Sequence, residues 1–388
     1  MIKSEEFEDK IEDIMKQNKD ILLKQIPIKE LKEFHKIIRE CFKELKVIVK
    51  GSRALNKFIK YSLYSKEELI NVDYDFYTLD SVKDLKYIVK KFEDSSIKYI
   101  KCMTLDFKSD ISRLFLYNIP IIDIEEISKK VYNNLCYKKM NGILYIHPEY
   151  YKIDLYSILS QPTRINMFTY EKAYKRLDLV ESNYPYKSKY KIETNDKISK
   201  EMKYILSILN KNTIIIGDYV YNKIIKKNIK LDYIELLTDD IFYYINKLKS
   251  KYGRRIYYKK IDKVLYMMSN SIVIYLDKIP ILILWNLVNN TSYTVKNGEK
   301  LCSRYYLRYY YNFLSFFNSF YPIFKSKDYY YALLKTIKIK SLPTLKSIGD
   351  INSDAKEQLD NIRTGKRKDF FRYDSTMIKK KDKDKNKK

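Results

Sequence analysis

The feature that most constrains the fold is a short apolar run that ends in glycine and serine. Residues 47–49 (Val-Ile-Val) are typical of a buried strand, and Gly51 and Ser52 follow where a helix is expected to begin. Asp73 and Asp75 lie in a second apolar stretch that also favours a strand. Side chains two residues apart in a strand project from the same face, so both carboxylates point the same way. This order predicts an α/β (α+β) fold, a mixed sheet with flanking helices.

The spacing of Asp73 and Asp75 is that of a metal-binding pair. In nucleotidyl transfer, two divalent ions about 3.5–4 Å apart activate the attacking hydroxyl and stabilise the leaving pyrophosphate. A third carboxylate on a neighbouring strand normally completes such a site. We choose Asp123, which lies in an apolar strand, because a buried acid is costly unless it is paired or metal-bound. Asp154 competes for this role, but it follows a His-Pro pair and fits a helix better.

Gly51 and Ser52 form a turn that suits a triphosphate. Glycine lets the backbone approach phosphate closely, and Ser52 offers its hydroxyl and amide at a helix N-terminus. Lys172 and Arg176, one turn apart on a later helix, are further candidates for contacts with nucleotide phosphates or a primer. For these two, a solvated helix face with i,i+4 pairing is the alternative. Together the residues predict a nucleotidyltransferase that uses two Mg²⁺ or Mn²⁺ ions and a nucleoside triphosphate.

The chain also carries a large excess of positive charge. Its 388 residues include 76 Lys and Arg against 49 Asp and Glu, a formal net charge of +27. This predicts a polyanionic partner, and nucleic acid in particular. Codon bias is a second source of lysine, because Lys, Ile, Asn, Tyr and Phe share A/T-rich codons and the chain holds 40 tyrosines. Such bias explains Lys in place of Arg but not the shortage of acids.

Several other classes are disfavoured by the composition. Four cysteines without a CxxC spacing and only two histidines argue against a zinc site and against His-based catalysis, so we expect reduced, structural thiols. A hydrophobic content of 45% argues against global disorder. There is no signal-peptide pattern and no run of about 18 uncharged apolar residues. We therefore expect a soluble, intracellular protein with no membrane partner.

The apolar pattern divides the chain into six segments. We expect N-terminal helices, a catalytic domain, a helical segment with a linker, a second sheet domain, C-terminal helices and a disordered basic tail. The boundaries, in that order, are 1–45, 46–140, 141–199, 200–300, 301–365 and 366–388. An aromatic helix at residues 304–320 could stack single-stranded bases. Apolar side chains on nearly all its sides favour a buried helix instead.

The second sheet domain reads as a repeat of the first. Residues 214–218 (Ile-Ile-Ile-Gly-Asp) echo residues 47–52, and a spacing of 50 residues between later landmarks recurs. Chance similarity between apolar strands is the alternative. The residues that stand for Ser52, Asp73 and Asp123 in this copy are Asp218, Tyr233 and Ile283. An aspartate at the turn would repel a triphosphate, and Glu235 alone cannot hold two metal ions. We therefore predict a degenerate nucleotidyltransferase-like domain without activity.

The order of these motifs resembles the catalytic subunit of poxvirus and giant-virus poly(A) polymerases. The resemblance is carried by Gly51-Ser52, Asp73-Tyr74-Asp75, Asp123, His147–Asp154, Ser160-Gln161-Pro162 and Tyr170–Leu177. It is best over residues 45–185 and faint beyond them. Arg53 stands where a small or apolar residue would be expected, which leaves its role open.

The resemblance implies template-independent polyadenylation of RNA. It implies ATP as the substrate, a single-stranded RNA 3′ end as the partner, metal ligands at Asp73, Asp75 and Asp123, and a triphosphate held by Gly51 and Ser52. It further implies a viral or virus-derived cytoplasmic enzyme, with a homodimer or a processivity subunit as further partners. Transfer of uridylate or CCA, synthesis of oligoadenylate, and a non-catalytic RNA-binding scaffold stay open as alternatives.

Overall fold

The computed structural model describes residues 26–59, 73–95, 97, 100–104, 111–117, 119–160, 167–195, 197–261, 271–287, 291–318 and 323–339. The first part of the predicted N-terminal helices and the whole of the predicted basic tail lie outside the described residues.

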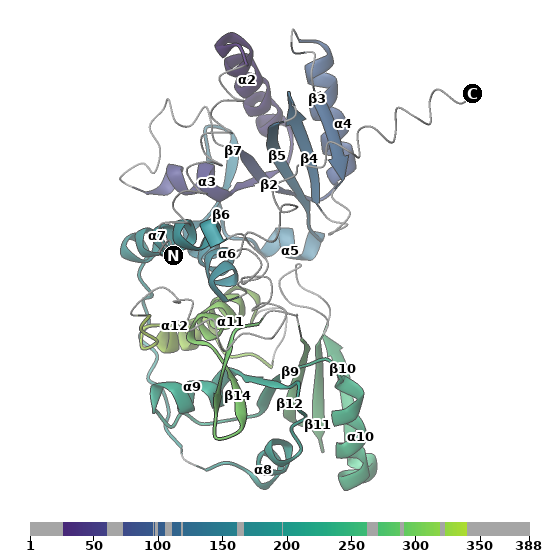
Figure 1. Ribbon diagram of the computed structural model, residues 1–388, viewed down its shortest axis with the longest axis vertical. Helices are drawn as coiled ribbons and strands as arrows, with labels where there is room; N and C mark the ends of the chain where they lie inside the picture. Colours follow the sequence, from purple (N-terminus) through teal and green to yellow (C-terminus); the bar gives the residue numbers. More distant parts are fainter. Residues whose placement is uncertain are drawn as a thin grey trace, which may run out of the picture.

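Two seven-stranded mixed sheets form the frame of the protein, one in the upper and one in the lower half of Figure 1. The strands of the first sheet are β1 (Ile48–Lys50), β2 (Tyr74–Thr78), β3 (Ile100–Thr104), β4 (Ile111–Leu116), β5 (Ile119–Glu126), β6 (Tyr137–Met140) and β7 (Ile143–Ile146). The strands of the second are β8 (Ile214–Ile216), β9 (Ile234–Thr238), β10 (Ile256–Ile261), β11 (Ser271–Leu276), β12 (Ile279–Asn286), β13 (Tyr293–Lys296) and β14 (Glu299–Cys302).

Both sheets have the same strand order. The first runs β3-β4-β5-β2-β1-β7-β6, and the second runs β10-β11-β12-β9-β8-β14-β13. Each strand of the second sheet thus takes the place of the strand seven numbers before it. The mixed sheets and their helices confirm the predicted α/β fold class. The identity of the second sheet as a degenerate nucleotidyltransferase-like domain stays a prediction.

Helices flank the sheets and fill the space between them. They are α2 (Ile28–Glu44), α3 (Gly51–Phe58), α4 (Ser81–Glu93), α5 (Lys129–Asn134), α6 (Pro148–Ser160), α7 (Met167–Asn183), α8 (Lys200–Ser207), α9 (Gly217–Ile225), α10 (Ile241–Tyr252), the 3₁₀ turn η3 (Gly253–Arg255), α11 (Arg304–Phe317) and α12 (Lys327–Leu334). Several begin at a side-chain cap. In α4, for example, the Asp80 carboxylate accepts a hydrogen bond from the Lys83 amide.

One face of the first sheet is covered by α2 and α4, which pack against each other through their apolar sides. Phe34 of α2 stacks on Phe92 of α4 with ring centroids 5.0 Å apart, and both side chains are buried. The opposite face of this sheet is turned toward the helices α6 and α7 in the middle of the molecule (Figure 1). The charged residues of the predicted site lie on that opposite face.

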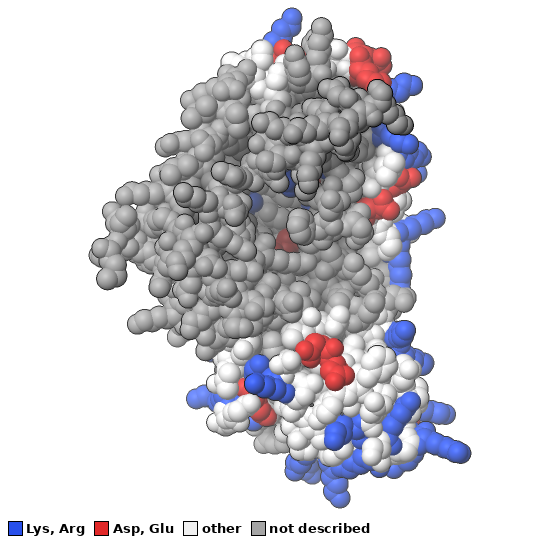
Figure 2. Space-filling model, turned by 45° about the vertical axis from the view of Figure 1, so that its right-hand side comes forward, with Lys and Arg blue, Asp and Glu red and all other residues white. Residues whose placement is uncertain are grey.

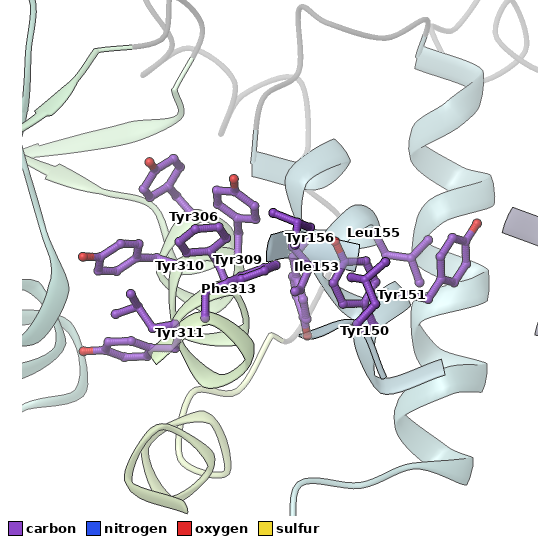
Figure 3. Close-up of a cluster of buried hydrophobic side chains, with 14 of the residues drawn as sticks. Tyr150, Tyr151, Ile153, Leu155, Tyr156, Tyr306, Tyr309, Tyr310, Tyr311 and Phe313 are labelled. Atoms are coloured by element: carbon purple, nitrogen blue, oxygen red, sulfur yellow. The ribbon is translucent and has the colours of Figure 1, made fainter. Parts of the chain in front are cut away.

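The central helices join the two halves through buried aromatic side chains. The aromatic helix expected at residues 304–320 is α11, and its packing against α6 is shown in Figure 3. Its rings at Tyr306, Tyr309 and Phe313 are at most 2% exposed, which confirms the expected core role. Arg308 of the same helix forms an ion pair with Glu181 of α7. The two halves are therefore held together by both apolar packing and a mostly buried charge pair.

Two further expectations concern the thiols and the membrane. Cys41, Cys136 and Cys302, the cysteines whose side chains the structure describes, are free thiols. Within the described ranges, no helix combines the length and apolar character needed to cross a membrane.

Candidate active site

Four charged residues stand in one row across the first sheet. β1 and β2 pair antiparallel with Lys50 opposite Asp75. β2 and β5 pair parallel with Asp75 beside Asp123, and β5 pairs antiparallel with β4 so that Asp123 faces Arg113. Residues opposite each other on neighbouring strands project from the same face of a sheet. Two of the predicted metal ligands are therefore adjacent, with a cation at each end of the row.

Arg113 binds both oxygens of Asp123. Its Nε donates to Oδ1 at 2.5 Å, and its Nη2 donates to Oδ2 at 2.6 Å. This two-pronged geometry is the strongest that a guanidinium and a carboxylate can form. Both side chains are about a third exposed, at 27% and 32%. In this structure, the Arg113 guanidinium is bound to the carboxylate that was predicted to bind metal.

Lys50, at the other end of the row, pairs with a further acid. Its Nζ donates a hydrogen bond to Glu125, which lies two residues after Asp123 on the same face of β5. Burial by itself lowers the pKa of Lys50, but the carboxylates of Glu125, Asp154 and Asp75 outweigh it and raise that pKa above its ordinary value. Lys50 is therefore a permanent positive charge in the row.

Asp75 carries the clearest electrostatic signature in the row. Its pKa is raised to about 6, first by burial, then by the Asp73 carboxylate and, more weakly, by that of Asp123, while the charges of Lys50 and Arg176 oppose the rise. Repulsion of Asp75 by the other two carboxylates places all three predicted ligands within electrostatic reach of one another. A divalent cation at this point would relieve that repulsion.

Gly51 brings the start of α3 against Asp75. Its backbone φ is +67°, which side chains disfavour, and a Cβ at this position would lie 2.2 Å from Oδ2 of Asp75. Ser52 follows and is buried. The first turn of α3, whose amides have no acceptor within the helix, and the carboxylate row therefore share one corner of the sheet.

The donor chemistry of this corner fits a hard divalent cation, although the geometry seen here is held by protein cations. Asp73, Asp75 and Asp123 offer only carboxylate oxygens, the ligands that Mg²⁺ and Mn²⁺ prefer. Among the residues that the structure describes, no three His, Cys, Asp or Glu side chains gather closely enough to hold a metal ion. Asp123 would first have to exchange Arg113 for the ion.

Comparison with known proteins decides the family of this region. Residues 36–165, which include the whole charged row, match the family described as "Poly(A) polymerase catalytic subunit". This region is similar to a poly(A) polymerase catalytic domain. The predicted resemblance is thus confirmed, and it supports a polynucleotide adenylyltransferase. No curated protein gives a significant sequence match.

The fold of this chain is also found in a solved structure. The chain is similar to the structure described as "Crystal structure of the Megavirus polyadenylate synthase", with a TM-score of 0.69 and 19% sequence identity. The match covers 93% of this chain and 76% of the other. At this identity the likeness shows the fold, and it extends over nearly the whole chain.

Arg53, whose role the sequence left open, fixes the backbone where it enters β2. Asp73 lies directly before that strand and is exposed. The Nε of Arg53 donates to the Asp73 carbonyl at 3.1 Å, and its guanidinium carbon lies 3.7 Å from the centre of the Tyr74 ring. His35 Nδ1 lies 2.9 Å from the Tyr74 hydroxyl. These contacts set the backbone position of Asp73, while its carboxylate stays accessible.

The remaining sequence-predicted residues lie on α6 and α7. Arg176 of α7 donates to the Tyr151 hydroxyl at 3.2 Å, and its charge acts on Asp75. Lys172 belongs to the same helix, but its side chain lies outside the described residues. Asp154 lies on α6, as expected, and contributes charge near Lys50. Arg176 is thus within electrostatic reach of the row.

The equivalent row of the second sheet has lost most of its charge. The residues in register there are Ile216, Glu235, Ile283 and Val273, in place of Lys50, Asp75, Asp123 and Arg113. The Tyr310 hydroxyl donates to Glu235 at 2.5 Å. Tyr311 and Tyr329 donate to Asp218, at 2.8 and 2.6 Å. Tyrosines of α11 and α12 thus close over the two remaining acids.

Sequence reasoning missed Arg113 and Lys50. Lys50 ends an apolar strand, and Arg113 lies within a largely apolar one. A single charged residue in an apolar strand is also what pointed to Asp123. What the sequence lacked was the register between strands, because only the pairing of β4 with β5 places Arg113 opposite Asp123.

Proposed function

We propose that this protein adds AMP from ATP to the 3′-hydroxyl of single-stranded RNA without a template. The observation that carries the proposal is the pairing of Asp75 with Asp123 on adjacent strands, beside the glycine turn at the start of α3. A carboxylate pair next to a helix N-terminus suits a triphosphate together with its metal ions.

Asp73, Asp75 and Asp123 are the residues that would hold two Mg²⁺ or Mn²⁺ ions. When bound, such ions make the RNA hydroxyl a better nucleophile and neutralise the departing pyrophosphate. The new bond joins the RNA 3′-oxygen to the α-phosphorus of ATP, and the bond from that phosphorus to pyrophosphate breaks. The protein's own contribution is to position the reacting groups and to supply fixed charge.

The proposed nucleotide contacts lie around the same corner of the sheet, at the start of α3. The backbone amides at Gly51 and Ser52 face the position of the triphosphate at the start of α3. Arg176, whose charge acts on Asp75 and which is held by the Tyr151 hydroxyl, is proposed as a further phosphate contact. Lys172, one turn earlier on α7, is proposed for the same role from its sequence position.

The contrast between the two sheets favours catalysis over a binding scaffold. The first row keeps two carboxylates and two cations, whereas the second keeps one acid, which accepts a hydrogen bond from the Tyr310 hydroxyl. Burying charge is costly, so charge that is kept in only one of two otherwise similar rows favours a chemical role for that row. A homodimer, a processivity subunit and a cytoplasmic location stay predictions from the family resemblance.

Primer extension tests the proposal. Purified protein is incubated with 5′-labelled oligo(A) and Mg²⁺ or Mn²⁺, with each nucleoside triphosphate in a separate reaction. We expect extension with ATP, and a loss of at least about 100-fold in rate for Asp75→Asn and Asp123→Asn. Asp178→Asn, an exposed acid on α7, is the matched control and should keep the rate.

Each of the other outcomes has a definite meaning. Equal or better extension with UTP or CTP would replace adenylate transfer by another terminal transferase. Unchanged extension in the Asp75/Asp123 double variant would refute the assignment of the site. RNA binding without extension by any nucleotide would favour the scaffold.

A further inference from the structure

One edge of the second sheet presents aromatic rings and basic side chains to solvent. Tyr257 of β10 lies opposite Tyr275 of β11, and the two rings stack with centroids 4.9 Å apart and planes 4° from parallel. The Nζ of Lys259 lies 5.8 Å from the centre of the Tyr275 ring. We call these three residues the tyrosine–lysine face. Tyr257 is 37% exposed, so its ring is available to a ligand.

The sequence around this face is basic without any acid. The stretch 241–260, which spans α10, η3 and β10, holds seven Lys and Arg residues and no Asp or Glu. All seven are exposed; they are Lys247, Lys249, Lys251, Arg254, Arg255, Lys259 and Lys260. Arg255 forms an ion pair with Asp277 of the neighbouring hairpin. Figure 2 shows basic side chains gathered on the lower lobe, which contains this sheet.

The tyrosine–lysine face is on the side of the sheet that corresponds to the catalytic side of the first. Lys259 is opposite Val273, Val273 is opposite Ile283, and Ile283 is beside Glu235. Side chains in such a row share one face. Tyr258, the next residue along β10, points to the other side, where its ring is 5.7 Å from the Nζ of Lys249 of α10. Since α10 packs on that other side, it leaves the tyrosine–lysine face open.

Two ordinary roles explain only part of this arrangement. Lysine on an edge strand prevents pairing with other chains, and a cross-strand tyrosine pair stabilises a sheet. Neither role requires an exposed ring beside a lysine in a stretch of sequence that holds seven basic residues and no acid. Single-stranded nucleic acid does use such a combination, because bases stack on aromatic rings while phosphates attract lysine and arginine.

We propose that single-stranded RNA lies along the tyrosine–lysine face, with bases stacked on Tyr257 and Tyr275 and phosphates near Lys259. The proposal rests on the proposed function, for which RNA is the substrate. It adds a place where RNA upstream of the reacting 3′ end is held on the second sheet, away from the catalytic row.

Anisotropy of a 5′-labelled oligo(A) of about 20 nucleotides, measured in EDTA without nucleotide, tests the stacking part. Tyr257→Ala/Tyr275→Ala should weaken binding at least about tenfold, because each base–aromatic stack contributes substantially to affinity. Tyr257→Phe/Tyr275→Phe should bind within about twofold of wild type. Tyr137→Ala is the matched control: Tyr137 is also an exposed tyrosine followed by two lysines on an edge strand, but it pairs with Ile146. Its affinity should not change.

A charge substitution tests the electrostatic part without disturbing the sheet. Lys259 is replaced by alanine, and the affinity is measured over a range of salt concentrations. The phosphate contact that is lost should reduce the slope of log Kd against log salt by about 0.7. The control replaces Lys83, an exposed lysine of α4, and should leave the slope as it is.

The outcomes separate this proposal from the proposed function. Wild-type affinity and salt slope in the tyrosine and the Lys259 variants would overturn the RNA site, even if primer extension succeeds. If the tyrosine double variant loses thermal stability, Tyr257→Ala alone and Lys259→Glu decide the question, and both must weaken binding. An unchanged affinity in those two would assign the pair to sheet stability. Loss of binding in the Tyr137 control to the same degree would also overturn the site. Failure of primer extension with these binding results intact would reject only the enzyme assignment.

Discussion

Arg113 and Asp123 face each other across β4 and β5, and the guanidinium of the first donates two hydrogen bonds to the carboxylate of the second. At the corresponding place in the second sheet, Val273 faces Ile283. An apolar pair therefore suffices at this position of the sheet, and an arginine is found there only in the sheet that has the aspartate. We infer that Arg113 compensates the charge of Asp123 in the metal-free protein.

Replacing Arg113 by alanine should tighten metal binding, because the guanidinium and a metal ion compete for the same two oxygens. A partly exposed ion pair contributes about 0.5–1 kcal/mol, so the dissociation constant for Mn²⁺ should fall roughly two- to fivefold. Calorimetric titration with Mn²⁺, without nucleotide, measures this constant. Arg255→Ala removes an arginine that also donates to both oxygens of an aspartate, Asp277, and should have no effect. Weaker Mn²⁺ binding by Arg113→Ala would show that Arg113 positions Asp123 for the metal instead.

The ionised Asp75 carboxylate should destabilise the metal-free protein at neutral pH. Burial and the two nearby carboxylates raise its pKa in the folded protein to about 6, from an ordinary value of 3.8. Between these values the folded state binds more protons than the unfolded state, so stability falls as the pH rises. The loss is complete above about pH 6 and amounts to at most about 3 kcal/mol.

Asp75→Asn should therefore stabilise the protein in EDTA by about 1–3 kcal/mol at pH 7.5 while nucleotide transfer is lost. Urea denaturation at a series of pH values measures the gain, which should shrink to a small remainder near pH 4, where the folded wild type is protonated at this site and the unfolded chain is about half protonated. An equal gain at pH 4 and pH 7.5 would mean that ionisation of Asp75 is not its source. Asp178→Asn serves again as the neutral comparison.

Gly51→Ala should abolish activity through a local clash. A Cβ at this position lies 2.2 Å from Oδ2 of Asp75, and the φ of +67° adds about 1–2 kcal/mol of strain. Asp75 must then move away from the phosphate corner. Gly217→Ala is the matched variant, because its Cβ would lie 1.6 Å from Oε2 of Glu235 at a φ of +69°. It should lower the melting temperature but preserve the rate of extension per folded molecule, and a rate loss equal to that of Gly51→Ala would contradict a passive second sheet.

The parts of the site that follow from local spacing could be predicted from the sequence. Alternation along a strand links Asp73 to Asp75, an apolar setting marks Asp123, and a Gly-Ser pair after a strand marks the phosphate corner. Arg113 and Arg53 could not be predicted in this way. The first depends on the register of β4 on β5, and the second depends on stacking across 20 residues of chain onto Tyr74.

The sequence carries a further signal of the repeat. Asn141-Gly142 joins β6 to β7, and Asn297-Gly298 joins β13 to β14, with positive φ at all four residues. Asn-Gly between two strands is the strongest short-range signal of a tight hairpin. Its occurrence at equivalent places in the two sheets supports the same strand order that the structure shows.

Glu235 gives the second sheet its own dependence on pH. Burial, and then the neighbouring Asp218 carboxylate, raise the pKa of Glu235 to about 8 from an ordinary 4.5. The folded protein thus keeps a proton that the unfolded chain releases, and stability falls as the pH rises from about 4.5 to 8. The hydroxyl of Tyr310 donates to this carboxyl group, an arrangement that glutamine can preserve.

Glu235→Gln, a mimic of the protonated acid, should therefore gain stability over the wild type as the pH rises. The difference in unfolding free energy should be small near pH 4.5 and should level off above about pH 8 at roughly 2–4 kcal/mol. Chemical denaturation over this pH range measures it, with Glu193→Gln, an exposed acid, as the control. Primer extension by Glu235→Gln should match that of the wild type, since the proposed catalytic row lies on the other sheet. A difference that is the same at pH 5 and pH 9 would show that Glu235 is already ionised in the folded protein and that the tyrosines around it bind a carboxylate.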